Sequence, residues 1–154
     1  MPIYYYSHGG DVAALAETIA KHYQMESVEL KPLKPYGKMM FFLQALGQTL
    51  GRKKPPLKDY PKPQGNESMF ICFPVWADNF AAPVNTFLAE NDLRDRKVIL
   101  ASCSQSSEPQ VAWKTFISEC PGTKLLGMKN FTTKGNPMSV DREDVLAWIR
   151  ELEV

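Results

Sequence analysis

The sequence lacks the features of secreted, membrane-spanning and metal-binding proteins. Its three cysteines, Cys72, Cys103 and Cys120, are an odd number without the spacing of metal ligands, which indicates reduced thiols and no metal. No apolar stretch reaches the roughly 18 residues that a membrane-spanning helix needs. The first residues lack the basic region and apolar run of a secretory signal. We therefore expect a cytoplasmic protein with no membrane partner.

The sequence also lacks an excess of charge of either sign. Its 18 basic and 17 acidic residues give a formal net charge of +1, which argues against a surface for nucleic acid. A chain of 154 residues buries about 68 to 70% of the surface that its unfolded state exposes. That is enough for one substantial core and too little for two ordinary domains. We expect a single domain over residues 1–154.

The first strongly patterned stretch predicts a strand, a tight turn and a helix. Ile3–Ser7 is rich in aromatic and β-branched residues, as in a strand buried on both faces. The pair Gly9-Gly10 breaks this pattern, because glycine adopts backbone angles that other residues resist. Helical spacing then places an apolar stripe at Val12, Leu15, Ala16 and Ile19. Such a turn leaves amides free at the helix N-terminus, so it is either a phosphate cradle or merely a turn.

The rest of the chain alternates between strand and helix patterns. Helices are predicted from Pro83, at about 109–119 and at about 141–152, the last burying Val145, Ile149 and Leu152. Further strands are predicted at Ser27–Leu30, Met69–Val75, Lys97–Ala101 and Lys124–Phe131. Parallel strands need right-handed crossovers, so this alternation predicts an α/β fold. We expect a doubly wound, five-stranded parallel sheet with strand order 2-1-3-4-5.

Residues 32–66 are predicted to form an insertion at the surface. A helical pattern at Lys38–Leu50 lies between two proline-rich stretches, the second running from Pro55 to Pro63. Its apolar side is Met39, Phe42, Leu43, Leu46 and Leu50. We interpret the basic cluster Arg52-Lys53-Lys54 after it as a solvated helix end rather than a docking patch.

Three loops are predicted to meet at the carboxyl edge of the sheet. They are SHGGDV at residues 7–12, PVWADNFAAP at 74–83 and SCSQSSEP at 102–109. In a sheet of this order, ligands bind where the strand order reverses. Cys103 lies at this edge, but the sequence places no base beside it, whereas Cys72 is interpreted as an apolar filler of a buried strand. Trp113 and Trp148 lie on predicted helices and are interpreted as core or boundary residues.

The chain resembles the flavodoxin-like family, in particular a bacterial branch of short FMN proteins. YYSHGGDV at residues 5–12 matches the branch's phosphate loop YYSxTGNT, and Pro74-Val75-Trp76-Ala77 matches its PxWW segment. Residues 82–88, APVNTFL, match PPVxTFL, and the insertion that begins at Lys34-Pro35-Tyr36 has a counterpart there. The most specific piece is PVWADNFAAPVNTFL, and the likeness covers nearly the whole chain.

The resemblance implies a site for FMN. By this likeness Trp76 would lie beside the isoalloxazine ring and help to set the flavin potential. The implied phosphate loop is Ser7, His8, Gly9, Gly10, Asp11 and Val12. The implied ring contacts are Pro74, Val75, Trp76, Ala77, Ser102, Cys103, Ser104 and Gln105.

The phosphate loop is degenerate by comparison with that branch. Gly9-Gly10-Asp11-Val12 replaces Thr-Gly-Asn-Thr, so both threonine hydroxyls are missing. Asp11 at about 6 Å would repel a phosphate dianion by about 1 kcal/mol in water and about 5 kcal/mol at an effective dielectric constant near 20. Alternatively, Asp11 serves as the N-cap of the helix. A protonated His8 would offset the carboxylate, or His8 is merely exposed.

The third loop and the tryptophan segment also depart from the branch. Ser104-Gln105 replaces Gly-Gly, which predicts backbone strain if positive φ angles are needed there. Ala77 stands where a second tryptophan is common, with Phe80 as a possible substitute.

Two functions follow as hypotheses. The first is an FMN-binding electron carrier or small flavin oxidoreductase, with a redox protein or a small-molecule acceptor as its partner. The near-neutral charge counts against it, because electron carriers of this family are usually strongly acidic. The second is a binding or regulatory module that keeps the fold and has lost FMN or binds it weakly.

Overall fold

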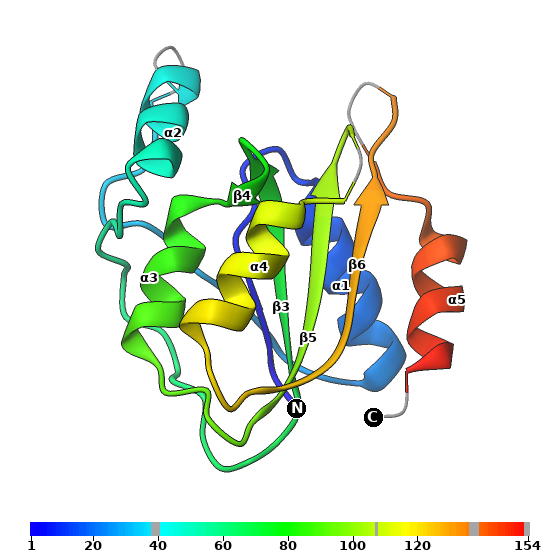
Figure 1. Cartoon of the computed structure of the whole chain (residues 1–154). Coiled ribbons are helices and arrows are strands. Elements are labelled where there is room, and N and C mark those ends of the chain that lie inside the picture. The colour runs from blue at the N-terminus through cyan, green and yellow to red at the C-terminus, as the bar shows by residue number, and fades with distance from the viewer. Residues whose placement is uncertain (38–40, 107, 136–138, 153–154) are drawn as a thin grey trace.

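The centre of the molecule is a parallel β-sheet, seen in a computed structural model that describes residues 1–37, 41–106, 108–135 and 139–152 (Figure 1). The parallel strands lie in the order β2-β1-β3-β5-β6, which confirms the predicted order. Their bounds are β1 Ile3–Tyr5, β2 Ser27–Glu29, β3 Met69–Trp76, β5 Lys97–Ser104 and β6 Lys124–Thr132. A two-residue strand, β4 (Asn79–Phe80), was not predicted and pairs antiparallel with the end of β3.

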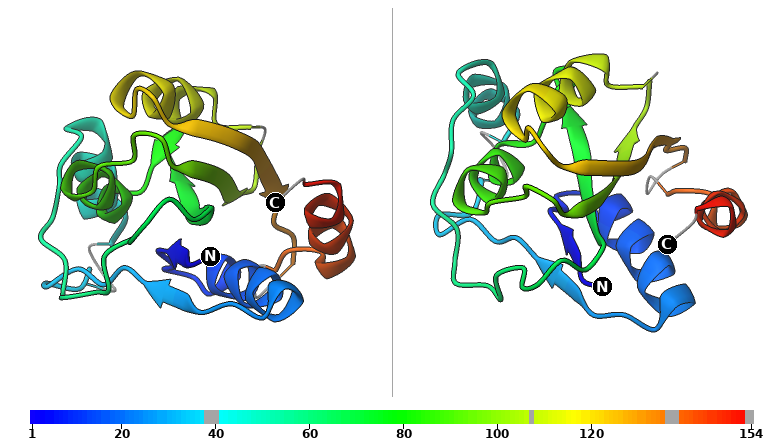
Figure 2. Two further views of the ribbon diagram at one scale, coloured as in Figure 1. Left: turned by 90° about the horizontal axis from the view of Figure 1, so that it is seen from below. Right: turned by 60° about the horizontal axis from the view of Figure 1, so that its bottom comes forward.

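Helices cover both faces of this sheet, as predicted (Figure 2). Helices α1 (Asp11–Tyr23) and α5 (Arg142–Glu151) pack on one face. Helices α3 (Ala82–Glu90) and α4 (Gln110–Glu119) pack on the other. Helix α2 (Phe41–Leu50) lies at one side of the molecule, in contact with α3 and with β3 (Figure 1). In the described part of the chain, no helix is long and apolar enough to span a membrane.

Two apolar cores, one on each face, hold the helices to the sheet. The predicted stripe of α1 is fully buried and packs with Ile3 and Phe70 of the sheet. On the opposite face, Val84 and Phe87 of α3 pack against Tyr4. Each large apolar side chain that is fully buried contributes about 1.5 to 3 kcal/mol to folding. Trp113 is buried in one core and Trp148 is partly buried against the other, as their helical positions predicted.

Several predicted boundaries are wrong. Ser102–Ser104 were predicted to be loop, but β5 continues to Ser104 because these residues stay paired with residues 130–132 of β6. The side chains of Ser102 and Ser104 also hydrogen-bond Asn130. Strand β1 ends at Tyr5, before Ser7, where the chain turns toward α1. Leu152 is only partly buried, since α5 ends one residue before it.

The helix of the insertion differs from its predicted pattern. Of its predicted residues, 38–40 and the side chain of Phe42 lie outside the described part of the structure. Leu43 and Leu50 are 64% and 71% exposed. Ala45 and Thr49 are buried instead. The insertion therefore presents apolar side chains to solvent.

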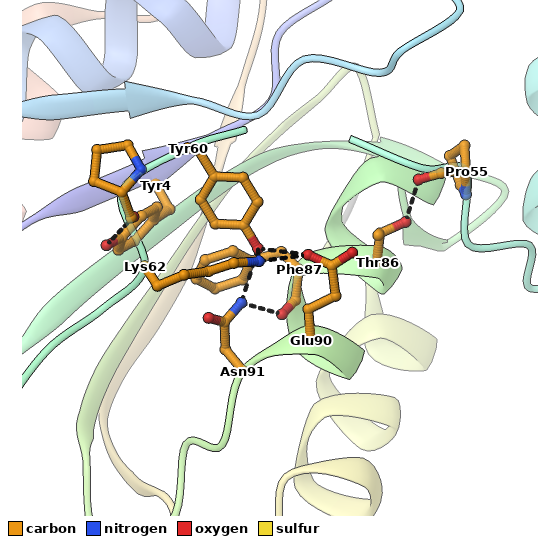
Figure 3. Close-up of polar contacts among 9 residues, drawn as sticks. Tyr4, Pro55, Tyr60, Lys62, Thr86, Phe87, Glu90 and Asn91 are labelled. Carbon is orange, nitrogen blue, oxygen red and sulfur yellow. Dashed lines mark hydrogen bonds and ion pairs between the residues drawn. The ribbon is translucent and has the colours of Figure 1, made fainter. Parts of the chain in front are cut away.

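The proline-rich stretch after α2 is fastened to α3 by polar contacts (Figure 3). The Thr86 hydroxyl donates a 2.7 Å hydrogen bond to the Pro55 carbonyl. The Tyr60 hydroxyl donates to Glu90, and the Asn91 amide donates to the same hydroxyl. Lys62 forms an ion pair with Glu90 at 2.6 Å. These contacts fix the path by which the chain returns from the insertion to β3.

Replacing Thr86 by valine should lower the free energy of unfolding by about 1 to 2 kcal/mol, because the Pro55 carbonyl loses a partly buried partner. Urea denaturation measures the difference. Thr18→Val is the matched control, since the Thr18 hydroxyl also donates to a backbone carbonyl, that of Ala14, but at the surface. Equal losses in the two variants would contradict a fastening role for Thr86.

Candidate functional site

A cleft of about 470 Å³ lies at the carboxyl edge of the sheet. It is bounded by the loop after β1, the hairpin of β3 and β4, and the end of β5. The residues that line it are His8, Gly9, Asp11, Phe41, Pro74, Val75, Trp76, Ala77, Asp78, Cys103, Ser104, Gln105, Ser106 and Thr133. A volume of this size is typical of small-molecule sites.

One wall of the cleft is aromatic and is organised around Trp76. The indole makes edge-to-face contacts with Tyr6, Tyr36 and Phe41, with ring centroids 5.4 to 5.6 Å apart. The Tyr36 hydroxyl donates a 2.6 Å hydrogen bond to Gln48 of α2. Burial raises the pKa of Tyr36 to about 12, so this hydroxyl remains protonated. The insertion thereby holds the orientation of the tryptophan.

Trp76 is carried by a tight hairpin. It pairs with Asn79, and the two residues between them, Ala77 and Asp78, have φ angles of 47° and 62°. Two consecutive positive φ angles are typical of the type I′ turns that join antiparallel strands. The carbonyl of Asp78 accepts the Ala112 amide at the start of α4. This contact fixes the tip of the hairpin relative to the sheet.

The loop before α1 satisfies several of its own amides. Gly10 has a φ of 96°, which glycine adopts without strain, and is the N-cap of α1. The Ser7 hydroxyl accepts hydrogen bonds from the Gly10 and Ala13 amides, both at 3.2 Å. Asp11 is therefore not the N-cap, contrary to the alternative drawn from the sequence. Its carboxylate accepts a 2.9 Å hydrogen bond from the Val12 amide. One of the amides at the N-terminus of α1 is thereby satisfied.

His8 closes one side of the cleft against the insertion. Its imidazole stacks on the Phe41 ring with centroids 3.4 Å apart and planes 2° apart. Burial lowers the pKa of His8, an effect that Asp11 partly opposes. The imidazole is therefore neutral at neutral pH, so it does not offset the charge of Asp11 as the sequence hypothesis required.

The opposite wall of the cleft is polar. The Ser104 carbonyl, at the end of β5, accepts the Thr133 amide at 2.8 Å. The Ser104 hydroxyl is within hydrogen-bond distance of the Asn130 amide group and the Ser106 carbonyl. In the described part of the chain, the non-glycine residues with positive φ at this edge are Ala77 and Asp78, and neither Ser104 nor Gln105 is among them. The strain predicted for Ser104-Gln105 is absent, because Ser104 lies in an extended strand.

Solved flavoproteins share this architecture. A protein from Bacteroides eggerthii, inferred to be a flavoprotein, superposes with a TM-score of 0.81 at 18% sequence identity, over 99% of this chain and 97% of that one. A flavoprotein from Lactobacillus acidophilus in complex with FMN gives 0.68 at 24% identity, over 84% and 91%. An oxidised flavodoxin from Bacillus cereus gives 0.54 at 14%, over 99% and 98%.

The chain has the flavodoxin-like fold. The sequence matches no family model and no curated protein. The resemblance read from the sequence motifs is thus confirmed at the level of the fold.

Of the fourteen residues that the flavodoxin-like resemblance assigned to a site, ten line the cleft and four do not. Ser7 and Gly10 are used within the turn before α1. Val12 is fully buried in the core beneath α1. Ser102 is fully buried and donates to Asn130. Val12 and Ser102 are thus buried beneath the surface, whereas Ser7 and Gly10 form the turn itself.

The structure adds four cleft residues that the sequence did not indicate: Phe41, Asp78, Ser106 and Thr133. Asp78 and Ser106 belong to loops already expected at this edge of the fold, and Thr133 follows the strand next to β5. Those three could have been found from the strand order. Phe41 could not, because the insertion reaches the cleft only through packing between segments far apart in the sequence.

Cys103 lines the cleft, but its thiol is buried. Its side chain is 2% exposed. Burial raises the pKa of the thiol, and the nearby Asp11 raises it further. A thiol in this state is a poor nucleophile. Cys72 is fully buried and its pKa is also raised by burial, as expected for an apolar filler. Among the described residues, no cluster of three or more histidines, cysteines or acids could hold a metal.

Proposed function

We propose that this chain binds FMN in the cleft and acts as an electron carrier or a small flavin oxidoreductase. The observation that carries the proposal is the convergence of the loop before α1, Trp76 and the polar end of β5 on one cleft. The flavodoxin-like fold supports it, because ligands of such sheets bind at this edge. The Lactobacillus acidophilus flavoprotein of the same fold was solved in complex with FMN.

The cleft residues fit the ring of a flavin. The Trp76 indole offers an aromatic face, and its orientation is held by Tyr36 and Phe41. The opposite wall offers hydrogen-bonding groups at Ser104, Gln105 and Thr133. An apolar wall with a few polar groups is the usual lining of a cofactor site. We expect the aromatic wall to exclude water from the ring and the polar wall to orient it.

The loop before α1 fits a phosphate less well. The Gly10 and Ala13 amides already donate to Ser7, and the Val12 amide already donates to Asp11. A phosphate at this helix end would replace the Asp11 carboxylate at the Val12 amide. Asp11 is only half-buried, so its side chain has room to turn toward solvent. To bind here, FMN therefore displaces the Asp11 carboxylate from the Val12 amide.

A bound flavin supplies transfer of one or two electrons, and the protein controls its position and potential. Few charged groups of this chain lie at the ring site. Asp11 and Asp78 are the carboxylates in the described cleft lining, and His8 is neutral at neutral pH because its pKa is lowered. A weakly negative surround of this kind disfavours added negative charge on a bound ring. We expect this to keep the flavin potential low.

The contacts of Ser7 and Asp11 favour a second candidate. Three amides that would meet a phosphate are already satisfied by side chains of the loop itself. In a chain that has lost FMN, such contacts would stabilise the N-terminus of α1, because they cap the helix without a ligand. In that case the protein is a binding or regulatory module with the flavodoxin-like fold.

A fluorescence titration separates the two candidates. Adding the purified protein to FMN should quench the flavin fluorescence to an end point of one FMN per chain, because Trp76 lies against the ring. Riboflavin, which lacks the phosphate, tests the ring site alone. Quenching of neither compound would exclude the FMN proposal and favour the module without flavin.

A further inference from the structure

The basic residues of this chain are concentrated in the insertion. Residues 30–58, a range that starts just before the insertion and ends before its one acidic residue, Asp59, include seven lysines and arginines and no acidic residue. The rest of the chain has eleven basic and seventeen acidic residues. The net charge of +1 is therefore the sum of a positively charged insertion and a negatively charged remainder of the chain. Fields of this kind steer the approach of a partner of opposite charge.

In the part of the chain that the structure describes, most of these basic side chains have no acidic partner. Lys31 pairs with Glu29, and Arg52 pairs with Glu119. In the described part of the chain, Lys34, Lys53, Lys54 and Lys58 are exposed and form no ion pair. Their charges are available to an external surface. This differs from the interpretation of Arg52-Lys53-Lys54 as a plain helix end.

Two of these lysines, Lys34 and Lys53, line a groove whose other lining residues are both apolar and polar. It has a volume of about 440 Å³, and its lining includes Tyr36, Leu43, Gly47, Lys34 and Lys53. Leu43 is 64% exposed, and Leu50, two turns further along α2, is 71% exposed. The groove thus combines an apolar floor with positive charge.

The groove adjoins the cleft through one side chain. Tyr36 lines the groove, and its ring contacts Trp76 and Phe41, which line the cleft. A second hollow, of about 230 Å³, contains Lys31, Lys58 and Tyr36 together with His8. An occupant of the groove would therefore contact Tyr36, whose ring in turn contacts the Trp76 and Phe41 rings that line the cleft.

We propose that the groove beside α2 docks a partner protein whose contact surface is acidic with an apolar centre. Charge complementarity selects this occupant, because glutamates and aspartates around apolar side chains match Lys34 and Lys53, which line the groove together with Leu43. The docking itself is independent of FMN. Only its role, to bring an electron donor or acceptor next to the flavin, rests on the proposed function.

Two other occupants match the groove less well. A second copy of this chain would bring the same basic insertion to a two-fold contact, and the like charges would repel. A membrane surface requires a continuous apolar helix face. In α2, Gly47 lies between the exposed Leu43 and Leu50, and the buried Ala45 and Thr49 are turned inward. The apolar area is therefore too small for an interfacial helix.

The probe is a short amphipathic peptide of glutamate and leucine, with glutamine in place of glutamate as its uncharged counterpart. The ¹⁵N-labelled protein without FMN should show peptide-dependent amide shifts on α2 and at residues 52–58. The binding should weaken with salt, because exposed charges are screened. Shifts confined to other surfaces, or equal binding of the glutamine peptide, would overturn the proposal.

The double variant Lys34→Glu, Lys53→Glu should lower the affinity for the glutamate peptide about tenfold or more. The matched control is Lys114→Glu, Lys124→Glu, which changes the charge equally at two exposed lysines elsewhere. An equal loss in the control would overturn the proposal. FMN titrations of both variants should be unchanged, so a failure of FMN binding is recognised separately from a failure of docking.

Two measurements test the other occupants. Sedimentation velocity should show a monomer at all concentrations, and a dimer abolished by the Lys34→Glu, Lys53→Glu variant would overturn the proposal in favour of a second copy. Vesicles of phosphatidylglycerol and phosphatidylcholine should leave the protein in the supernatant. Co-sedimentation that this variant abolishes would overturn it in favour of a membrane surface.

Discussion

Replacing Asp11 by asparagine should tighten FMN binding about fivefold or more. The carboxylate accepts the Val12 amide at the end of α1, where the proposed phosphate would lie. The substitution removes repulsion between a carboxylate and a dianion, which is worth about 1 kcal/mol or more at this range, and each 1.4 kcal/mol corresponds to about tenfold in affinity. Fluorescence titration of the variant with FMN measures the change.

Asp78→Asn is the matched control for this prediction. Asp78 lines the same cleft but belongs to the hairpin rather than to the phosphate loop. Asparagine tolerates its positive φ of 62°. Riboflavin should bind Asp11→Asn and the unmodified protein equally well. Unchanged FMN affinity in Asp11→Asn, or a gain as large for riboflavin as for FMN, would contradict a phosphate position at this loop.

The family likeness also points to threonine at position 12, but the structure argues against that change. Val12 is fully buried in the core under α1. A threonine there would bury a hydroxyl among apolar side chains, at a cost of about 1 to 3 kcal/mol if it lacks a partner. Asp11→Asn alone is therefore the better substitution for restoring phosphate binding to this loop.

Replacing Trp76 by alanine should weaken FMN binding about tenfold to a hundredfold and shift the flavin potential. The indole is the aromatic face of the cleft, and it also holds Tyr6, Tyr36 and Phe41 in their edge-to-face contacts. Its loss removes a stacking contact worth about 0.5 to 1.5 kcal/mol together with the burial of the ring. FMN titration and redox titration of the bound flavin measure the two effects.

Trp76→Phe should restore most of the affinity, because it keeps an aromatic face. Trp148→Phe, on the opposite side of the sheet, should leave both the affinity and the potential unchanged, since that indole packs against Phe70 and Phe131. An unchanged potential in Trp76→Ala would place the indole away from the ring, and the account of the aromatic wall would be wrong.

The sequence predicts those parts of the fold that depend on local pattern. The apolar stripe of α1 and the alternation of strands and helices follow from periodicity, and strand order follows from crossover rules. The end of β5 does not, because Ser102 and Ser104 read as a loop until their side chains meet Asn130 on the neighbouring strand. Strand β4 was missed because its turn, Ala77-Asp78, has positive φ angles without the usual glycine.

The candidate site was predictable in outline and not in its detail. Strand order alone brings Trp76, Gln105 and the loop before α1 to one edge. The contribution of Phe41 depends on how the insertion folds back, which no local pattern records. The role of Asp11 was open between N-cap and phosphate neighbour, and the observed contact with the Val12 amide is a third arrangement.

The most direct test of the central claim is a crystal structure of the protein soaked with FMN. The account predicts electron density for the isoalloxazine ring beside Trp76, with the phosphate at the start of α1 and the Asp11 carboxylate turned away from the Val12 amide. A cleft without flavin density after soaking, with Asp11 still accepting that amide, would contradict it.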